Sequence, residues 1–291
     1  MTVHRQKPRP PDRLALSSRE PATHNAAQAQ SLRGVRPGIT PAPGHGRVRA
    51  ADLGFDLRLR RVAVAFEVTV PDPGARRGGR SRDVALVRSE LLRTVRDVFA
   101  DPQDIVAGTA PGWIGVLHRL PARAPADAPA ADCRRVTDVI AAQDGLTARA
   151  GIGEPAASVG GLHDSYQDAC DALRLGARVD GGSTVHPIGD LRVHQLLAAV
   201  SRSARTRLLD LTAARLREQP DWPVLRDTIT AWCASGFNLV RASAALHIHR
   251  NTVVYRMNKI EQLTGRPLRE HRTAMALYLP CLADRLGGPD R

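Results

Sequence analysis

The sequence of 291 residues lacks long hydrophobic runs and has only four cysteines. No apolar segment approaches the roughly 18 to 20 residues that a membrane-spanning helix requires. The basic, proline-rich start also lacks the hydrophobic stretch of a secretory signal. The cysteines, at positions 133, 170, 233 and 281, form no C-x-x-C pair. We therefore expect reduced, mostly buried thiols in a cytoplasmic protein without a membrane segment.

Common enzyme motifs are absent as well. The sequence has no G-x-x-x-x-G-K-[ST] phosphate loop and no G-x-S-x-G nucleophile elbow, and Gly151-x-Gly153 is too short for a dinucleotide fingerprint. His247 and His249 have the spacing of a metal pair, but no cysteine or third ligand lies near them in the sequence. Cap and turn roles are therefore favoured. We expect no cofactor, no metal site and no catalytic residue.

Positive charge is concentrated at the two ends of the chain. The net charge is +13; residues 1–50 carry nine basic and two acidic residues, and residues 224–291 carry ten and five. Clustered positive charge is typical of proteins that bind the phosphate backbone of nucleic acids. Only Lys7 and Lys259 are lysines, so a general bias toward arginine contributes to this pattern.

Residues 1–50 contain seven prolines and little apolar periodicity. Such a segment cannot bury enough surface to offset chain entropy, so it is predicted to be a disordered basic tail. Two interpretations stay open for this tail: a basic arm that touches DNA, and a solvated segment without a role.

The middle of the chain alternates between strand and helix patterns, which predicts an α/β (or α+β) domain over residues 57–188. Residues 107–112 are predicted to be the connection of a β-hairpin. Leucine spacing after residue 190 predicts a helical connector over 189–222. Strands are expected at 61–70, 104–106, 113–117, 148–152 and 185–188, and helices at 83–100, 130–142 and 162–176.

Residues 223–287 are predicted to form an all-α helix-turn-helix domain. A first apolar helix stops at Gly236, and Asn238 is suited to cap a short helix over 239–246. His247 and Ile248 make the turn, and a third helix follows over 250–263. Pro280 is expected to kink or end the last predicted helix, over 273–286.

The third helix is the candidate recognition helix. Val253, Met257 and Ile260 are expected to face inward, which leaves a polar and cationic set on its other face and at its start. Side chains of this kind are needed to contact base edges in the major groove and backbone phosphates. The competing interpretation is an ordinary solvated helix face. The candidate DNA-binding residues are His249, Arg250, Asn251, Thr252 and Tyr255 near the bases, and Arg256 and Lys259 at phosphates.

The sequence NLVRASAALHIHRNTVVYRMNKIEQLTG over 238–265 resembles the C-terminal helix-turn-helix of PucR/CdaR-type transcriptional regulators and is related in pattern to Fis-type domains. Upstream, Gly151-x-Gly153, the Leu162-x-x-Ser-Tyr-x-x-Ala169 pattern and Leu173 are similar to the GGDEF-like domain that precedes it in that family. The resemblance implies a GGDEF-like domain and a sequence-specific regulator with double-stranded DNA as its partner. A homodimer is expected because one helix-turn-helix has a small footprint on DNA.

The departures from the family pattern are informative. Val254 and Asn258 stand where the family often has arginine, which implies fewer phosphate contacts from this helix. The sequence also leaves no room for the usual N-terminal sensor domain, so neither the effector nor its chemical class is carried over.

Two other functions compete with this expectation. One is a Fis-like architectural protein that binds DNA with low specificity; the α/β domain argues against it. The other is a GGDEF-type nucleotide enzyme, which needs acidic residues at its hairpin to hold metal ions. Residues 107–112 offer none, and Asp101 and Asp104 are expected to be solvated loop carboxylates, so we expect a protein that is not an enzyme.

Overall fold

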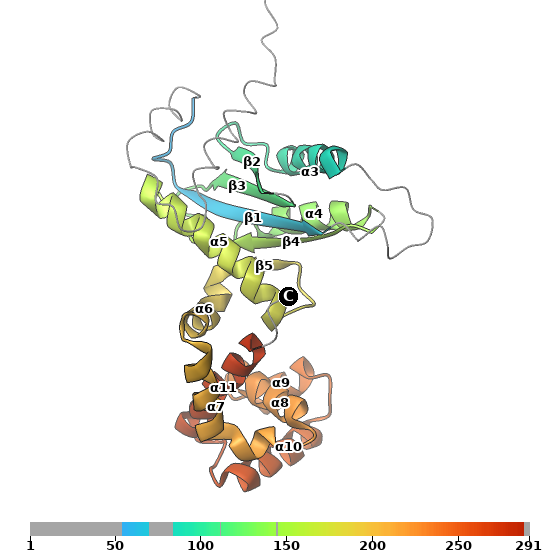
Figure 1. The fold of residues 1–291 in the computed structure, drawn as a ribbon, viewed down its shortest axis with the longest axis vertical. Coiled ribbons are helices and arrows are strands. Elements are labelled where there is room, and N and C mark those ends of the chain that lie inside the picture. The colour runs from blue at the N-terminus through green and yellow to red at the C-terminus, as the bar shows by residue number, and fades with distance from the viewer. Residues whose placement is uncertain (1–53, 70–83, 111, 144, 288–291) are drawn as a thin grey trace, which may run out of the picture.

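A mixed five-stranded sheet forms the first half of the computed structural model, which describes residues 54–69, 84–110, 112–143 and 145–287 (Figure 1). The strand order is β2-β3-β1-β4-β5; only the β4–β5 pair is parallel. The tail predicted over residues 1–50 lies outside the described residues. The strands are β1 (Arg61–Thr69), β2 (Ile105–Ala110), β3 (Trp113–Arg119), β4 (Thr147–Ile152) and β5 (Val185–Pro187).

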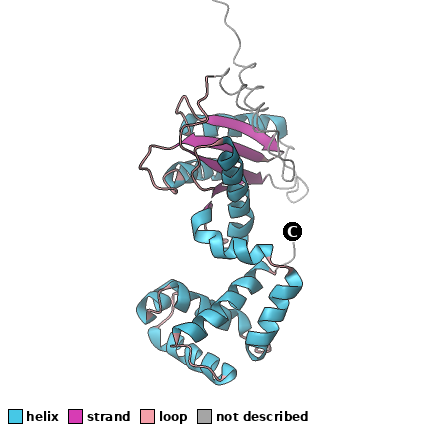
Figure 2. Ribbon diagram, turned by 90° about the vertical axis from the view of Figure 1, so that its left-hand side faces the viewer, coloured by secondary structure: helices cyan, strands magenta, loops and turns pink. Residues whose placement is uncertain are grey.

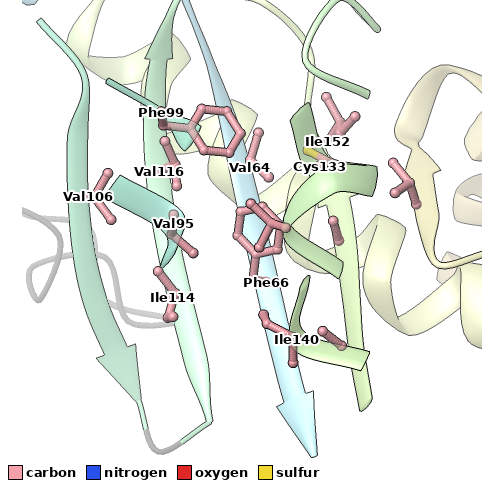
Figure 3. Packing of buried hydrophobic residues seen from close by; sticks show 14 of the residues in the cluster. Val64, Phe66, Val95, Phe99, Val106, Ile114, Val116, Cys133, Ile140 and Ile152 are labelled. Carbon is pink, nitrogen blue, oxygen red and sulfur yellow. The ribbon is translucent and has the colours of Figure 1, made fainter. Parts of the chain in front are cut away.

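Helices cover both faces of this sheet. Helices α3 (Val84–Val98) and α4 (Ala130–Ala141) pack on one face, and α5 (Val159–Val179) packs on the other. The central strand β1 sends Val64 and Phe66 toward α3 and α4 (Figure 3) and places its alanines against α5. Because both faces are buried, the strand is a continuous apolar run. The predicted α/β domain is confirmed.

Helix α5 approaches β4 closely because glycines line the contact. A Cβ atom added at Gly151 would lie 2.0 Å from the carbonyl oxygen of Ala169, and one at Gly153 would lie 1.9 Å from that of Ser165. The Ser165 hydroxyl in turn accepts a hydrogen bond of 2.9 Å from the amide of Ala63. The Gly-x-Gly pattern therefore serves helix–strand packing in this fold.

The second half is all helical, as predicted. Its elements are the 3-10 helix η2 (Ile188–Leu191) and the α-helices α6 (Arg192–Ala199), α7 (Arg202–Arg217), α8 (Trp222–Ala234), α9 (Leu239–Ala245), α10 (Arg250–Thr264) and α11 (His271–Leu286). Their shared core contains the fully buried Leu216, Leu225, Ile229, Ile260 and Leu268.

The segment predicted as a connector is divided between two environments. Helix α6 packs against α5, η2 and α11, whereas α7 adds Leu209, Ala213 and Leu216 to the core around α8 and α10. Helix α7 bends at Ala213, whose φ of −133° is not helical. The second part of the segment is thus packed into the helical domain.

Figure 2 shows the strands confined to one half of the molecule, with the all-helical half beside it. The two halves are joined where the C-terminal ends of α5 and α11 meet. The Arg285 guanidinium of α11 donates to the Val179 carbonyl oxygen of α5 at 3.2 Å. Reciprocally, Arg178 of α5 donates to the Leu286 carbonyl oxygen of α11 at 3.4 Å. Each helix therefore supplies a cation to the unsatisfied carbonyl end of the other, where the helix dipole favours positive charge.

Three local predictions are corrected. The hairpin connection is not 107–112, because β2 runs to Ala110 and pairs Ala107 with Gly115. Helix α11 does not end at Pro280, which is buried inside it among core residues. Asp104 is not solvated: it is buried, with its carboxylate 2.8 Å from the His118 ring and 2.7 Å from the Arg119 amide.

Candidate nucleic-acid interface

The helix-turn-helix begins with a sharply ended α8. Gly236 adopts φ +63°, and its amide donates to the Cys233 carbonyl oxygen at 3.1 Å. The amide of Phe237 donates to the Trp232 carbonyl oxygen at 3.0 Å, which completes a Schellman motif. The side-chain rings of Trp232 and Phe237 pack edge to face, with their centroids 5.9 Å apart. This closure fixes the direction in which the chain enters α9.

Helix α9 starts as predicted at Asn238. Its side-chain oxygen accepts hydrogen bonds of 3.0 Å from the amides of Val240 and Arg241. An N-cap of this kind satisfies donors that the first turn of a helix leaves unpaired. The side chain of Ala242 is fully buried, so this small residue allows α9 to approach the neighbouring helices.

The turn between α9 and α10 is a second Schellman motif, built on a histidine. His247 adopts φ +53°, and its amide donates to the Ala244 carbonyl oxygen at 3.1 Å. The amide of Ile248 donates to the Ser243 carbonyl oxygen at the same distance, while its side chain packs against the core. The predicted turn role of His247 and Ile248 is confirmed.

Helix α10 is capped at both ends. The His249 Nδ1 atom accepts a hydrogen bond of 3.3 Å from the Asn251 amide, which confirms the predicted cap role of this histidine. Gly265 ends the helix in the left-handed conformation, with φ +66°. The predicted inward residues, Val253, Met257 and Ile260, are buried in the helical core.

An exposed stripe runs along the opposite side of α10. It is formed by Asn251, Tyr255, Asn258 and Gln262, which follow helical spacing. The Tyr255 ring is 70% exposed, and Arg250 is exposed at the start of the helix. Thr252 is half-buried. Sequence reasoning found the first two turns of this stripe and missed Asn258 and Gln262, although their spacing from Tyr255 indicates the same face.

Lys259 is engaged within the protein. Its Nζ atom lies 2.7 and 2.9 Å from the two carboxylate oxygens of Asp221, at the start of α8. The hydrogen bond from Lys259 holds the pKa of the Asp221 carboxyl below its ordinary value, and the nearby charge of Arg256 lowers it further. Lys259 thus lies on the side of α10 that faces α8, away from the exposed stripe.

The segment 236–272 has seven Arg and Lys residues and two Glu residues. Apart from Lys259, none of these cations has a carboxylate within ion-pair distance among the described residues. The arginines at the other end of the domain, Arg226 and Arg285, pair with Asp284 and Asp227. Unpaired positive charge is therefore gathered around the helix-turn-helix, at Arg241, Arg250, Arg256, Arg266, Arg269 and Arg272.

Three further features concern metal binding, the cysteine thiols and membrane insertion. Within the described ranges, no group of three or more His, Cys, Asp or Glu side chains is placed to hold a metal ion. All four cysteines are free, and burial raises the pKa of the Cys170 thiol to about 11 and that of Cys233 to about 12. No described helix is long and apolar enough to cross a membrane.

Comparison with known families matches both halves of the chain. Residues 225–283 match the PucR C-terminal helix-turn-helix domain, and residues 42–175 match the GGDEF-like domain. The first match spans the elements α8 to α11 and includes every residue of the exposed stripe. The second spans the sheet from β1 to β4 and most of α5.

Three of the relatives that the chain resembles are named as regulators. It is 30% identical over 139 residues to the carbohydrate diacid regulator of Escherichia coli K12 and 26% identical over 148 residues to the purine catabolism regulatory protein of Bacillus subtilis 168. These alignments cover 48% and 50% of this chain. The transcriptional activator PmfR of Paenarthrobacter nicotinovorans is 29% identical over 147 residues, or 48% of this chain. The matches cover 36%, 28% and 30% of the relatives' own lengths.

Proposed function

We propose that this chain, which matches the PucR-type helix-turn-helix and the GGDEF-like domain and resembles PucR/CdaR-type regulators, is a sequence-specific transcriptional regulator that reads duplex DNA with α10. The observation that supports this role most strongly is the exposed stripe on α10 together with Arg250 at its start. A recognition helix presents its first turns to base edges, and these turns carry hydrogen-bonding and cationic side chains.

The proposed roles follow from side-chain chemistry. Arg250 can donate two hydrogen bonds to guanine, and Asn251 can pair with adenine in the same bidentate manner. Thr252 and the exposed Tyr255 ring offer contacts to a thymine methyl group or a phosphate. His249 orders the start of the helix as its cap, and Arg256 is assigned to the phosphate backbone, which positions the protein without specifying sequence.

Lys259, a phosphate contact by sequence reasoning, receives a different role in this proposal. Its bidentate pair with Asp221 holds α10 against the start of α8. We expect Lys259→Ala to lower the stability of the helical domain while leaving the salt dependence of DNA binding unchanged.

The test of base reading uses duplexes selected from a random pool by the full chain. Arg250→Ala should weaken binding to the selected duplex by about 1–3 kcal/mol and broaden the preference at one base position. Arg93→Ala, which removes an exposed cation from α3 in the other domain, is the matched control. Equal losses in the two variants, measured by fluorescence anisotropy, would argue against the assigned role of Arg250.

We further propose that the regulator acts as a cytoplasmic homodimer, because two half-sites about one helical turn apart would supply more affinity than one. The four most exposed large hydrophobic side chains of the described residues fall into two pairs. Val240 (68%) and Tyr255 (70%) lie on the helix-turn-helix, while Leu196 (70%) and Leu211 (73%) lie on α6 and α7. The second pair lies outside the helix-turn-helix, and we assign Leu196 and Leu211 to the contact between the two subunits.

The dimer is tested by sizing the chain at micromolar concentration. Leu196→Glu combined with Leu211→Glu should shift the protein toward monomer and weaken binding to a two-half-site duplex more than to a single half-site. Wild-type protein that stays monomeric on the two-half-site duplex would contradict the dimer. In this proposal the GGDEF-like domain is non-catalytic and transmits a signal or contributes to dimerisation.

A further inference from the structure

The loop between α10 and α11 is held rigidly in place by side chains from two helices. The Leu268 amide donates to a carboxylate oxygen of Glu261 on α10 at 2.7 Å. The Leu268 carbonyl oxygen accepts from the indole nitrogen of Trp232 on α8 at 3.3 Å, and the Leu268 side chain is fully buried. Because the amide, the carbonyl group and the side chain of Leu268 are all held in this way, the loop residues next to it have defined backbone positions.

This loop places the start of α11 beside the start of α9. The His271 ring stacks on the Phe237 ring, with centroids 4.2 Å apart and an interplanar angle of 22°. Phe237 immediately precedes Asn238, the N-cap of α9. A further contact links the Cys233 thiol to the Ala274 carbonyl oxygen at 3.7 Å. The first turn of α11 is therefore packed against the α8–α9 junction.

Exposed arginines surround this contact. Arg269 and Arg272 flank His271 on both sides, and Arg241 lies in the first turn of α9. All three side chains are exposed, and none has a carboxylate partner in the part of the chain that the structure describes. Cations whose backbone positions are held by the surrounding contacts, and whose side chains are exposed and not paired within the protein, are suited to an external polyanion.

We propose that Arg241, Arg269 and Arg272 form a cationic flank that contacts the phosphate backbone of DNA beside the groove occupied by α10. In a helix-turn-helix complex the first helix crosses the backbone while the second enters the groove. The first helix here is α9, so the residues gathered at its start face phosphates. This inference rests on the proposed function. It assigns to Arg269 and Arg272, at the start of α11, the phosphate contact that Lys259 does not provide because it is bound to Asp221.

The test measures binding to a random-sequence duplex by fluorescence anisotropy between about 0.05 and 0.2 M KCl. Loss of one phosphate contact reduces the slope of log K against log salt by about 0.9. The double variant Arg269→Ala, Arg272→Ala should therefore bind with a slope shallower by about 1.8, and with affinity reduced on the order of tenfold per arginine at 0.1 M salt. Arg269→Lys with Arg272→Lys should restore the slope.

The control removes the same charge elsewhere: Arg93→Ala with Arg134→Ala, on exposed positions of α3 and α4, should leave the slope unchanged. Circular dichroism melting establishes that each variant is folded. Wild-type protein that binds no duplex would overturn the proposed function itself. Wild-type binding with an unchanged slope in the Arg269→Ala, Arg272→Ala variant would overturn only the cationic flank.

Discussion

At the scale of single residues, His247 adopts a backbone conformation that glycine would occupy at lower cost. Its φ of +53° places the backbone in the left-handed region, where the Cβ atom crowds the following carbonyl group. We expect His247→Gly to raise the free energy of unfolding of the helical domain by about 0.5–1 kcal/mol, measured by urea denaturation. Gly265→Ala, at φ +66°, should change stability in the opposite direction.

His194 makes the stability of the fold depend on pH. Its ring is buried in α6, and neither ring nitrogen has a hydrogen-bond partner among the described residues. Burial, and then the charge of Arg285, lower its pKa below the ordinary value of 6.5. The His194 ring therefore binds a proton more readily in the unfolded chain than in the folded one. The contribution of the neutral His194 to the free energy of unfolding is complete above about pH 6.5 and is lost as the pH falls through and below that value.

Melting at pH 7.5 and 5.5 checks this expectation. Wild-type protein should melt at a lower temperature at pH 5.5 than at pH 7.5. The His194→Leu variant should show a smaller difference between its two melting temperatures. His186, whose pKa burial also lowers, accounts for part of the dependence that remains. Val193→Ala, at an exposed and non-titrating position of the same helix, should retain the full difference; a reduction there equal to that of His194→Leu would contradict the assignment.

At the scale of elements, the contact between β4 and α5 leaves no room for a methyl group. An added Cβ at Gly151 would lie 2.0 Å from one backbone atom of α5 and 2.9 Å from another. We expect Gly151→Ala to destabilise the α/β domain by about 1–3 kcal/mol in denaturant titrations. Gly160→Ala is the matched control, because a Cβ at this position of α5 meets nothing within 4 Å; it should be neutral or stabilising.

The sequence allowed most elements to be predicted because local periodicity and caps determine them. Asn238, Gly236 and the inward residues of α10 all follow from spacing and capping rules. The extent of β2 does not, because Gly108 and its neighbours gain strand conformation from pairing with β3. Helix α11 likewise continues through Pro280 because Leu277 and Cys281 bury their side chains in the helical core, which outweighs one lost hydrogen bond.

Within the candidate interface, the first turns of α10 were predictable and two other features were not. The pairing of Lys259 with Asp221 joins residues 38 positions apart, and no local pattern reports such a contact. The cationic flank depends on the stacking of His271 on Phe237, which is also a tertiary contact. Sequence reasoning identifies charged side chains, whereas the fold determines which of them are left without an internal partner.

At the scale of the whole molecule, the reciprocal arginines at the ends of α5 and α11 couple the two domains. Arg285 donates both to the Val179 carbonyl oxygen and, at 2.9 Å, to the Asp227 carboxylate of α8. Removing it leaves the Val179 carbonyl oxygen without this donor and leaves Asp227 with its weaker 3.3 Å pair to Arg226, in a partly buried junction. We expect Arg285→Ala to cost about 1–3 kcal/mol of stability and to separate the unfolding transitions of the two domains.

Denaturation followed by two probes checks this coupling. In a Trp113→Phe background, which removes the tryptophan of β3, Trp222 and Trp232 report on the helical domain by fluorescence, while far-ultraviolet circular dichroism reports on the whole chain. The two curves should coincide more closely for the wild type than for Arg285→Ala. Arg93→Ala should behave as the wild type, and coincident curves for Arg285→Ala would show that the junction does not depend on this residue.

The central claim is that this chain distinguishes DNA sequences with α10. The most direct measurement is a competition at about 0.15 M salt between a duplex selected by the full chain and a random duplex of equal length. A specific regulator should prefer the selected duplex by a factor of about 10³ or more, and Arg250→Ala with Asn251→Ala should remove most of that preference. Equal competition by the two duplexes against the wild-type protein would contradict the account and favour an architectural DNA-binding protein.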